Sequence, residues 1–324
     1  MKILITGGAG FIGSHLSDEL LRRNYDVTII DDLSTGSMDN IAHLKDNPRF
    51  HFVIETIMNE MVMDRLVSEC DAIFHLAAAV GVDLIVNRPV EVIERNILGT
   101  DLVLKVATRY RKKVFIASTS EIYGKSDKVP FMEDDDRLLG STMKSRWCYS
   151  SSKAVDEFLG LAYYKEKQLP IIIGRFFNTV GPRQTGQYGM VVPRFVKQAL
   201  RGEPIVVFGD GEQSRCFAYV TDVVRASIAL LEHPDAVGDI FNIGNDEEVT
   251  INELAERVVS ITKSRSEIRH ISYDEAYERG FEDMRRRIPD LTKIKNLVEY
   301  SPSVGFDEML VKIVEYVRLH ELKK

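Results

Sequence analysis

The feature of this sequence that most constrains its fold is the glycine-rich run TGGAGFIGSH near the amino terminus, which separates the apolar segment KILIT from an amphipathic segment. Gly7, Gly10 and Gly13 recur at every third position. Glycine weakens the interiors of helices and strands, so a cluster at such a junction needs a structural reason. A positive φ and a close approach of the backbone to a ligand supply that reason, and helix N–H groups attract anions. The run therefore predicts a strand, a phosphate-binding turn and a helix.

Apolar segments of strand length alternate with longer segments of helical period through the first half of the chain. They predict strands at residues 3–6, 26–30, 50–54, 72–76, 113–117 and 171–175. Alternation of this kind is typical of a parallel sheet with helices on both faces. The predicted fold class is therefore α/β, with a Rossmann-type doubly wound parallel sheet.

The regular alternation fades after about residue 180, which indicates a smaller C-terminal lobe of mixed α/β structure. Helices are predicted within VVPRFVKQALRG and TDVVRASIALLEH and at residues 251–262 and 306–322, with a strand in EPIVVFG. We expect residues 1–178 to form the dinucleotide-binding domain and residues 179–324 to form the substrate lobe, from which some strands or helices return to the first domain. No linker rich in proline, glycine or serine separates the two, so a shared interface with a cleft is expected.

Composition excludes several classes of protein. Hydrophobic residues make up 44% and charged residues 28% of the chain, which is typical of a soluble globular protein, so no membrane association is expected. A formal net charge of -7 gives no basic excess for a nucleic-acid backbone, so nucleic acid is not an expected partner. Cys70, Cys148 and Cys216 are odd in number and widely spaced, which predicts neither a disulfide framework nor a metal site. These cysteines and the lack of a secretion-signal pattern predict a cytoplasmic protein.

Two carboxylates follow the second predicted strand, in DVTIIDD. Asp31 or Asp32 would lie where a dinucleotide-binding fold hydrogen-bonds the ribose of adenosine. A carboxylate there would repel the additional phosphate of NADP, so the pair favours NAD as the cofactor. The alternative interpretation is an aspartate that ends a strand in a solvated turn.

The segment RWCYSSSKAVDEF carries a tyrosine and a lysine on a predicted helix. Tyr149 and Lys153 are four residues apart and therefore share a face of that helix. A phenol keeps its proton up to a pH of about 10, but a neighbouring ammonium stabilises the phenolate and lowers its pKa. Tyr149 would then take a proton from a substrate hydroxyl as hydride leaves for a nicotinamide ring. Surface helices carry such a pair by chance, so its meaning depends on its neighbours.

Polar neighbours follow the strand in KKVFIASTSEIYGK, which ends in Thr119, Ser120 and Glu121. Ligands of open parallel sheets bind beyond the carboxyl ends of the strands, so these side chains are expected to reach the cleft. Thr119 would hydrogen-bond the hydroxyl that Tyr149 deprotonates, and Glu121 would act as an acid or base one or two carbons away. The alternative is a strand-to-turn cap made by serine and threonine.

With these motifs in place, the chain resembles the extended short-chain dehydrogenase/reductases, specifically the nucleotide-sugar epimerase, decarboxylase and dehydratase family. The resemblance covers residues 1–295 and includes FHLAA, NILGT, RFFNTVGPR, GDGEQSRCFAYVTDV and FNIGN. It implies NAD in the first lobe and a nucleoside diphosphate sugar, such as a UDP-sugar, in the second. The cofactor-binding residues that it implies are Gly7, Gly10, Phe11, Ile12, Gly13, Asp31, Asp32, Leu76, Ala77, Ala78, Asn96, Tyr149 and Lys153.

The resemblance also assigns residues to the substrate. Asn178 matches the asparagine of the family that contacts the diphosphate, and Arg215 matches an arginine that holds the diphosphate or the sugar. Arg183 and Arg287 are further candidates for the same anion, because guanidinium groups suit phosphate oxygens. For Arg183 and Arg287 a surface ion pair is the alternative. Thr56 stands near the position where the family often has an aspartate that contacts adenine.

Three reactions of the family start from hydride removal at C4 of the sugar, which gives a 4-keto intermediate. The triplet Thr-Ser-Glu and the motif SRCF look most like UDP-glucuronate decarboxylases, so decarboxylation of a UDP-hexuronate is the first expectation. A UDP-sugar 4-epimerase is the alternative, and then an NDP-sugar 4,6-dehydratase, in which an acid would stand at the position of Ser120. A non-catalytic NAD-binding module on the same fold is the remaining hypothesis.

Two predicted helices are expected to pair two copies of the chain. The resemblance implies a homodimer through helices at residues 90–109 and 150–167. The segments LVLKVATRY and VDEFLGLAYY carry apolar stripes wide enough for a core face and a partner face. The alternative is ordinary packing of both helices onto the sheet.

Overall fold

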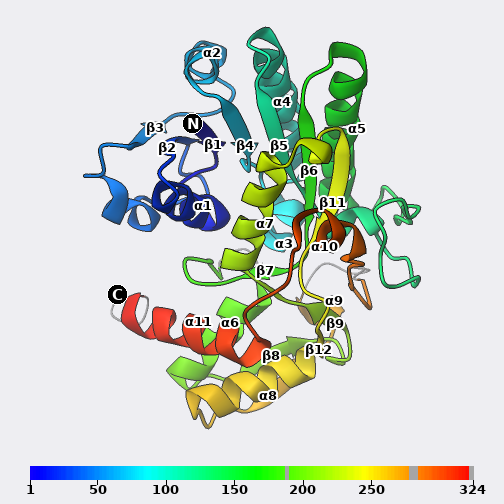
Figure 1. Cartoon of the computed structure of the whole chain (residues 1–324). Coiled ribbons are helices and arrows are strands. Elements are labelled where there is room, and N and C mark those ends of the chain that lie inside the picture. Colours follow the sequence, from blue (N-terminus) through cyan, green and yellow to red (C-terminus); the bar gives the residue numbers. More distant parts are fainter. Residues whose placement is uncertain (187–189, 277–283, 321–324) are drawn as a thin grey trace.

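The centre of the molecule is a parallel sheet of seven strands in the order β11-β6-β5-β4-β1-β2-β3 (Figure 1). The structure is a computed structural model that describes residues 1–186, 190–276 and 284–320. The strands of the sheet are β1 (Lys2–Thr6), β2 (Asp26–Asp31), β3 (Phe50–Ile54), β4 (Ala72–His75), β5 (Lys113–Thr119), β6 (Ile171–Phe176) and β11 (Asp239–Ile243). The predicted Rossmann-type sheet is confirmed, and six of its strands lie where the sequence predicts them.

Helices cover both faces of this sheet. One face carries α1 (Phe11–Arg22), α7 (Val220–Glu232) and α10 (Thr292–Val298), and the other carries α2 (Glu60–Glu69), α4 (Pro89–Arg109) and α5 (Trp147–Lys167). Successive side chains of a strand point to opposite faces, so Ile3 and Ile5 of β1 join the first apolar layer and Leu4 joins the second. Strands that are buried on both faces read as nearly continuous apolar runs, which is why the sequence pattern located them.

The second lobe has its own core, below the sheet in Figure 1. Its helices are α6 (Val191–Arg201), α8 (Ile251–Thr262) and α11 (Phe306–His320). Its strand pairs are β8 (Ile205–Phe208) with β13 (Ile268–Ile271), β9 (Ser214–Cys216) with β12 (Glu248–Thr250), and β7 (Thr179–Val180) with β10 (Ala218–Tyr219). The lobe is mixed α/β, as the sequence predicts. The end of the helix predicted at 306–322 lies outside the described residues.

The chain returns to the first sheet twice after it enters the second lobe. α7 and β11 follow β10 in sequence, yet β11 pairs in parallel with β6 and forms the edge of the sheet. α10 packs in the apolar layer of α1 before α11 rejoins the core of the second lobe. The lobes are therefore interleaved along the chain, and the single boundary at residue 178 stays a prediction.

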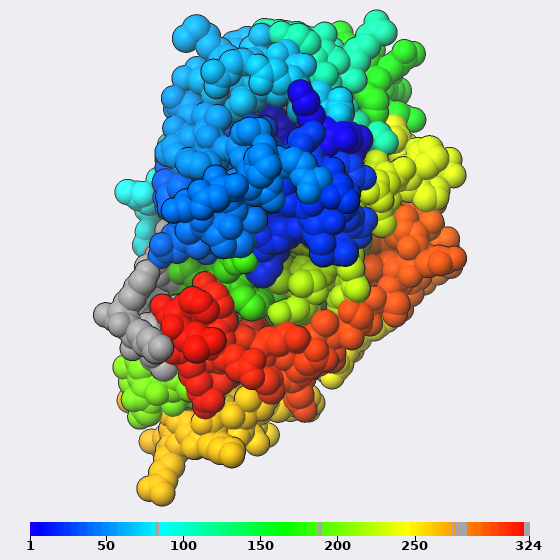
Figure 2. All heavy atoms as spheres, turned by 60° about the vertical axis from the view of Figure 1, so that its left-hand side comes forward, coloured from blue at the N-terminus to red at the C-terminus, as the bar shows by residue number. Residues whose placement is uncertain are grey.

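The carboxyl-terminal helix brings the second lobe close to the amino-terminal residues. Figure 2 shows the end of α11, in red, directly beneath the blue residues of the first lobe. Tyr316 and His320 of α11 line the same cavity as Asp39 and Asn40. The remaining short helices are α3 (Val82–Asn87) and α9 (Tyr273–Ala276). Within residues 1–186, 190–276 and 284–320, no helix has the length and apolar character that crossing a membrane requires.

Candidate active site

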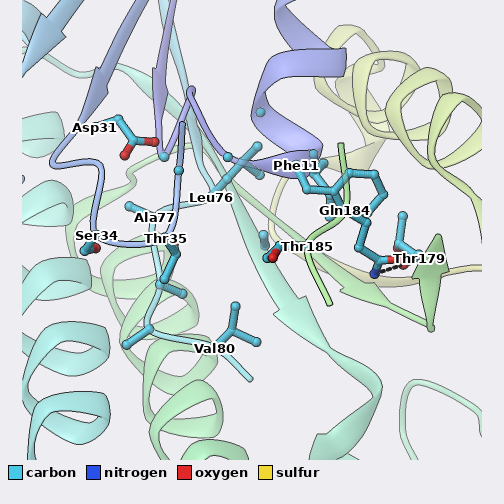
Figure 3. A pocket seen from close by; sticks show the side chains of 18 of the residues that line it. Phe11, Asp31, Ser34, Thr35, Leu76, Ala77, Val80, Thr179, Gln184 and Thr185 are labelled. Atoms are coloured by element: carbon cyan, nitrogen blue, oxygen red, sulfur yellow. Dashed lines mark hydrogen bonds between the residues drawn. The ribbon is translucent and has the colours of Figure 1, made fainter. Parts of the chain in front are cut away.

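A cavity of about 1080 Å³ lies at the carboxyl ends of the central strands, between the two lobes. Its lining includes residues that directly follow β1, β2, β4 and β5, and Asn178 two residues after β6. Figure 3 shows Asp31 and Ser34 on one side and Thr179 with Gln184 on the other, where Nε2 of Gln184 donates to the Thr179 carbonyl over 2.9 Å. This is the position at which open parallel sheets bind ligands.

The glycine run forms the tight turn between β1 and α1 that the sequence predicts. Gly7 has a φ of +73°, and a Cβ there would lie 2.9 Å from the backbone of Ala77. A Cβ on Gly13 would lie 2.3 Å from the Gly7 carbonyl oxygen. Gly10 is the N-cap of α1 and no side chain caps that helix, so its first N–H groups are available to an anion. Gly7, Gly10, Phe11, Ile12 and Gly13 all line the cavity.

Asp31 ends β2, and its carboxylate hydrogen-bonds the backbone of the glycine turn. Its carboxylate accepts hydrogen bonds from the backbone N–H groups of Ala9, over 2.9 Å, and Leu33, over 2.8 Å. Burial raises the pKa of this carboxyl group, and the two N–H groups oppose that rise. Asp31 lines the cavity and lies near Ala77 in Figure 3.

Asp32 also lines the cavity but has partners of its own at the rim. One carboxylate oxygen accepts from the backbone N–H of Ser34 over 2.9 Å, and the other lies 3.3 Å from Nη1 of Arg95. Arg95 donates to the hydroxyl of Ser34 over 2.9 Å. Thr56, Ser34 and Arg95 line the same part of the cavity wall as the two aspartates.

The predicted residues after β4 divide into two groups. Leu76, Ala77 and Ala78 line the cavity. Asn96 of α4 is buried and is not among the lining residues. Its amide oxygen accepts from the backbone N–H of Ala79 over 2.8 Å, and its amide nitrogen donates to Ser152 Oγ over 3.2 Å. Asn96 therefore fixes the loop after β4 against α5.

The predicted catalytic residues meet at one end of the cavity. Thr119 ends β5, Ser120 and Glu121 follow it, and Tyr149 and Lys153 lie on α5; all five line the cavity. The side chain of Thr119 lies near the phenol of Tyr149. Thr119 Oγ1 also accepts from the backbone N–H of Glu121 over 3.2 Å, so the strand-to-turn cap and the contact with Tyr149 occur together.

Two contacts fix α5 relative to β5. The hydroxyl of Ser150 donates to the carbonyl of Glu121 over 2.8 Å. Glu157 accepts from Ser118 over 2.6 Å and pairs with Arg175 of β6 over 2.8 Å. Because these groups are buried, they hold the tyrosine face of α5 at the end of the strand.

The surroundings of Tyr149 oppose its ionisation. Burial raises the pKa of the phenol, and the carboxylates of Glu121 and Asp156 raise it further. The hydrogen bond from Thr119 and the charge of Arg287 lower it. The sequence predicted Lys153 as the activating cation, but its Nζ lies 2.7 Å from Oδ2 of Asp156 in a buried ion pair. The sequence analysis did not identify Asp156.

Two of the predicted substrate residues converge on Glu121. Asn178 accepts from Nη1 of Arg287 over 3.3 Å, and the same Nη1 lies 3.9 Å from Oε1 of Glu121. Asn178 also donates to the carbonyl of Cys216 over 3.2 Å. Arg287 is almost buried, so its charge acts within the cavity rather than at the surface.

The other two predicted arginines have different positions. Arg183 lines the cavity, and its Nη1 lies 2.8 Å from Oδ2 of Asp18, the ion pair that was the alternative for this residue. Arg215 is buried in β9 and donates to the carbonyl of Ser214 over 2.8 Å. Arg215 is not among the residues that line the cavity, so the structure does not bring it to the predicted site.

The cavity also has lining residues that the sequence analysis missed. They include Ser34, Thr35, Ser37, Asn40, Thr179, Gln184, Thr185 and Lys197. Most lie in polar loops that directly follow β2 and β7, and position after a strand is the signal that would have found them. Among the described residues no cluster of three or more His, Cys, Asp or Glu side chains is arranged to hold a metal ion.

Comparisons with known proteins agree with this geometry. The family model described as GDP-mannose 4,6 dehydratase matches residues 4–313. A UDP-N-acetyl-alpha-D-glucosaminuronate decarboxylase of Bacillus cytotoxicus is 42% identical over 318 residues, which is 98% of each chain. The chain belongs to the nucleotide-sugar-modifying family of extended short-chain dehydrogenase/reductases. The resemblance seen in the sequence is confirmed.

Two further family members span different reactions. UDP-glucuronic acid decarboxylase 1 of Danio rerio is 36% identical and covers 97% of this chain and 72% of its own length. The solved UDP-glucuronic acid 4-epimerase of Bacillus cereus, in complex with UDP-glucuronic acid and NAD, is 31% identical, with a TM-score of 0.90 and coverage of 98% of this chain and 99% of its own. This chain is therefore an NAD-dependent nucleotide-sugar enzyme of that family.

The residues present fit NAD. The Gly7 to Gly13 turn leaves no room for Cβ atoms at its first and last glycines, and the uncapped start of α1 faces the cavity. A pyrophosphate group requires such a cradle. The carboxylate of Asp31 stands at the end of β2, where the adenosine ribose lies in dinucleotide-binding folds.

Proposed function

We propose that this enzyme decarboxylates a UDP-hexuronate through a 4-keto intermediate. The observation that carries the proposal is the meeting of Glu121, Tyr149 and Arg287 in one cavity. A carboxyl group beside the phenol supplies a second acid or base close to the oxidised carbon. Two decarboxylases among its relatives, those of Bacillus cytotoxicus and Danio rerio, support the same reaction.

Tyr149 is the proposed base for the C4 hydroxyl, and Thr119, which lines the cavity beside it, is the proposed hydrogen-bond partner that orients that hydroxyl. NAD, when bound, accepts the hydride from C4 and later returns it. A ketone at C4 makes the C6 carboxylate a β-keto acid. Its C5–C6 bond breaks, CO₂ leaves, and the electron pair moves to the C4 oxygen as an enolate.

The enolate then needs stabilisation and a proton. The hydroxyls of Tyr149 and Thr119 are the proposed donors to the C4 oxygen, as in an oxyanion hole. Glu121 is the proposed group that delivers the proton to C5. Arg287 and Asn178 are the proposed contacts for the negatively charged substrate, because guanidinium and amide donors suit phosphate and carboxylate oxygens. Gly7, Gly10 and Gly13 are proposed for the pyrophosphate of NAD, and Asp31 for its ribose.

The second candidate is 4-epimerisation. It is favoured by the solved 4-epimerase whose title names a hexuronate nucleotide and whose TM-score to this chain is 0.90. Both reactions begin with oxidation at C4 and use Tyr149 and Thr119 alike. They differ in the fate of the ketone, since epimerisation returns hydride to the opposite face and needs no proton at C5.

Product analysis distinguishes the two. The protein is incubated with UDP-glucuronate, UDP-N-acetylglucosaminuronate and UDP-glucose, and products are followed by NMR together with CO₂ release. We expect CO₂ and a nucleotide-linked pentose, with or without the acetamido group, from one of the two hexuronates. Inversion at C4 without CO₂ would replace this proposal by the epimerase.

We also propose a homodimer through α4 and α5. These helices pack side by side, and exposed apolar side chains include Val90 and Phe158, each 66% exposed, with Leu98 and Val155. Solvent-facing apolar groups in this number are typical of an interface between copies. The free thiols of Cys70, Cys148 and Cys216 support the cytoplasm as the proposed location.

A further inference from the structure

Lys153, the lysine of the proposed catalytic pair, is held by a buried carboxylate. Its Nζ lies 2.7 Å from Oδ2 of Asp156, and the two side chains are 3% and 0% exposed. Asp156 stands one turn after Lys153 on α5, so both side chains leave the helix on the same face. A buried pair of charges is stable when hydrogen bonds satisfy its remaining lone pairs and protons.

Polar side chains lie behind Asp156, toward the sheet. Thr100 of α4 lies near the Asp156 carboxylate, and its Oγ1 lies 3.0 Å from Nε2 of His75 at the end of β4. The other ring nitrogen, Nδ1, lies 2.8 Å from Oγ1 of Thr6 on β1. The hydroxyl of Thr6 also accepts from the backbone N–H of Ala77 over 3.2 Å. Among the described residues Oδ1 of Asp156 has no hydrogen-bond partner, so the bond from Lys153 to Oδ2 is the contact that fixes this carboxylate.

His75 adds no charge beside the ion pair. Burial and the charge of Lys153 lower the pKa of His75 to about 3, so its ring is uncharged near neutral pH and has a single N–H. The hydroxyls of Thr6 and Thr100 can each donate or accept, so they satisfy both ring nitrogens. The carboxylate of Asp156 is therefore the charge that faces Lys153 at this end of α5.

We propose that Asp156 is a positioning residue of the active site, which fixes Lys153 through the buried ion pair and adds a negative charge beside Tyr149. Its effect on turnover rests on the proposed role of Tyr149 as the base. The negative charge of Asp156 offsets the positive charge of Lys153, so less of that positive charge is available to stabilise the phenolate of Tyr149.

Charges around this cluster come from every element packed against it. The groups are Glu121 after β5, Arg287 of the second lobe, His75 of β4, Arg175 of β6 and, on α5 itself, Cys148, Lys153, Asp156 and Glu157. Glu157 and Arg175 neutralise each other in a buried pair. Removal of the Asp156 charge therefore leaves Lys153 and Arg287 against Glu121 alone, so the phenol ionises at lower pH.

The test is an NMR titration of Tyr149 in the NAD-loaded, full-length protein with ¹³C-labelled tyrosine rings. The resonance is assigned by its loss in Tyr149→Phe. In Asp156→Asn, which keeps the size of the side chain, we expect the midpoint of the Tyr149 titration to fall by about one pH unit or more. Glu166→Gln removes a carboxylate from the exposed end of the same helix and is expected to leave the midpoint unchanged. This measurement needs no turnover, so it stays valid if the product analysis rejects decarboxylation.

A second variant covers the case in which Asp156→Asn does not fold. Asp156→Ser has a smaller side chain and removes the same charge, so it is expected to move the Tyr149 midpoint in the same direction. A folded variant without the Asp156 charge whose Tyr149 midpoint is unchanged or higher would overturn the proposal.

Discussion

Burial and the charges of two carboxylates, Glu121 and Asp156, act on Tyr149, so its proton is held more tightly than that of a phenol in water. Burial is the largest cause, and the charge of Glu121 is the next. A base in such a place works only when cationic groups and the substrate itself offset these effects. At the scale of single residues, the proposed reaction therefore depends on one hydroxyl group and its nearest charges.

Tyr149→Phe is expected to abolish turnover, a loss of at least about a thousandfold, because the C4 hydroxyl loses its base. The ring remains and fills the same volume, so binding of NAD and of the sugar nucleotide should stay within about twofold of the wild type. Calorimetric titration measures the binding, and NMR of the products measures turnover. Residual turnover close to that of the wild type would exclude Tyr149 as the base.

Glu121→Gln separates the proposed steps. The amide cannot deliver a proton to C5, so CO₂ release should fall by about a hundredfold or more. Oxidation at C4 uses Tyr149 and Thr119, so absorbance of reduced nicotinamide should still appear when the hexuronate is added. Glu166→Gln, the same change at the exposed end of α5, is the matched control. If Glu121→Gln released CO₂ at the wild-type rate, the carboxyl group would have no part in the reaction.

Burial of His75 makes the free energy of unfolding depend on pH. Its folded pKa of about 3 lies below its ordinary value of 6.5, so in the interval between them only the unfolded chain takes up the proton. The free energy of unfolding therefore falls as the pH falls below 6.5, by about 1.4 kcal/mol per pH unit. His15, whose pKa burial lowers to about 4, adds a similar contribution.

Urea unfolding at several pH values below 6.5 measures this slope. His75→Gln keeps hydrogen-bonding groups but does not titrate, so about half of the slope should disappear. His51→Gln changes an exposed histidine on β3 and should keep the full slope. An unchanged slope in His75→Gln would mean that the imidazole is accessible to protons in the folded state.

At the scale of elements, the strands and long helices could be predicted because their burial leaves a regular apolar pattern. β11 was missed as a strand because its place beside β6 depends on a long-range pairing that no local pattern encodes. The two-residue strands β7 and β10 are too short for any periodicity. The same limit applies to the site. The family resemblance implied Asn96 and Arg215 as binding residues, but sequence motifs do not tell how a side chain packs, and in the structure both are buried and neither is among the residues that line the cavity.

The turn between β1 and α1 is predicted to be intolerant of a methyl group. Gly13→Ala would bring a Cβ to 2.3 Å from the Gly7 carbonyl oxygen, so the turn must shift. We expect a loss of about 1–3 kcal/mol in the free energy of unfolding and at least a tenfold loss of NAD affinity. Gly305→Ala makes the same chemical change where nothing lies within 4 Å, and both quantities should stay unchanged. Denaturant titration and calorimetry provide the measurements.

At the scale of the whole molecule, side-chain contacts join the two lobes beside the cavity. Arg183 of the loop after β7 pairs with Asp18 of α1 over 2.8 Å, and His15 lies 3.0 Å from the carbonyl of Pro182. These contacts hold that loop against α1, the helix that follows the glycine turn. The cofactor and the substrate therefore share walls, and neither lobe offers a complete site alone.

The proposed dimer belongs to this scale as well. Phe158→Glu would put a charge into the centre of the proposed α4–α5 interface, where burying it without a partner is costly. We expect a monomer in sedimentation equilibrium at micromolar concentration, with wild-type secondary structure. Leu319→Glu, which changes an apolar residue 60% exposed on α11, should remain a dimer. A wild-type protein that sediments as a monomer would reject the interface.

The double return of the chain to its first sheet has a consequence for how the protein can be divided. A fragment ended at residue 178 would lack β11 and so leave the hydrogen-bonding edge of β6 open, a template for aggregation. It would also lack α7, which shields α1. Neither piece is therefore expected to fold alone. Sequence changes in the second lobe can alter substrate recognition only if β11 still pairs with β6 at the edge of the first sheet.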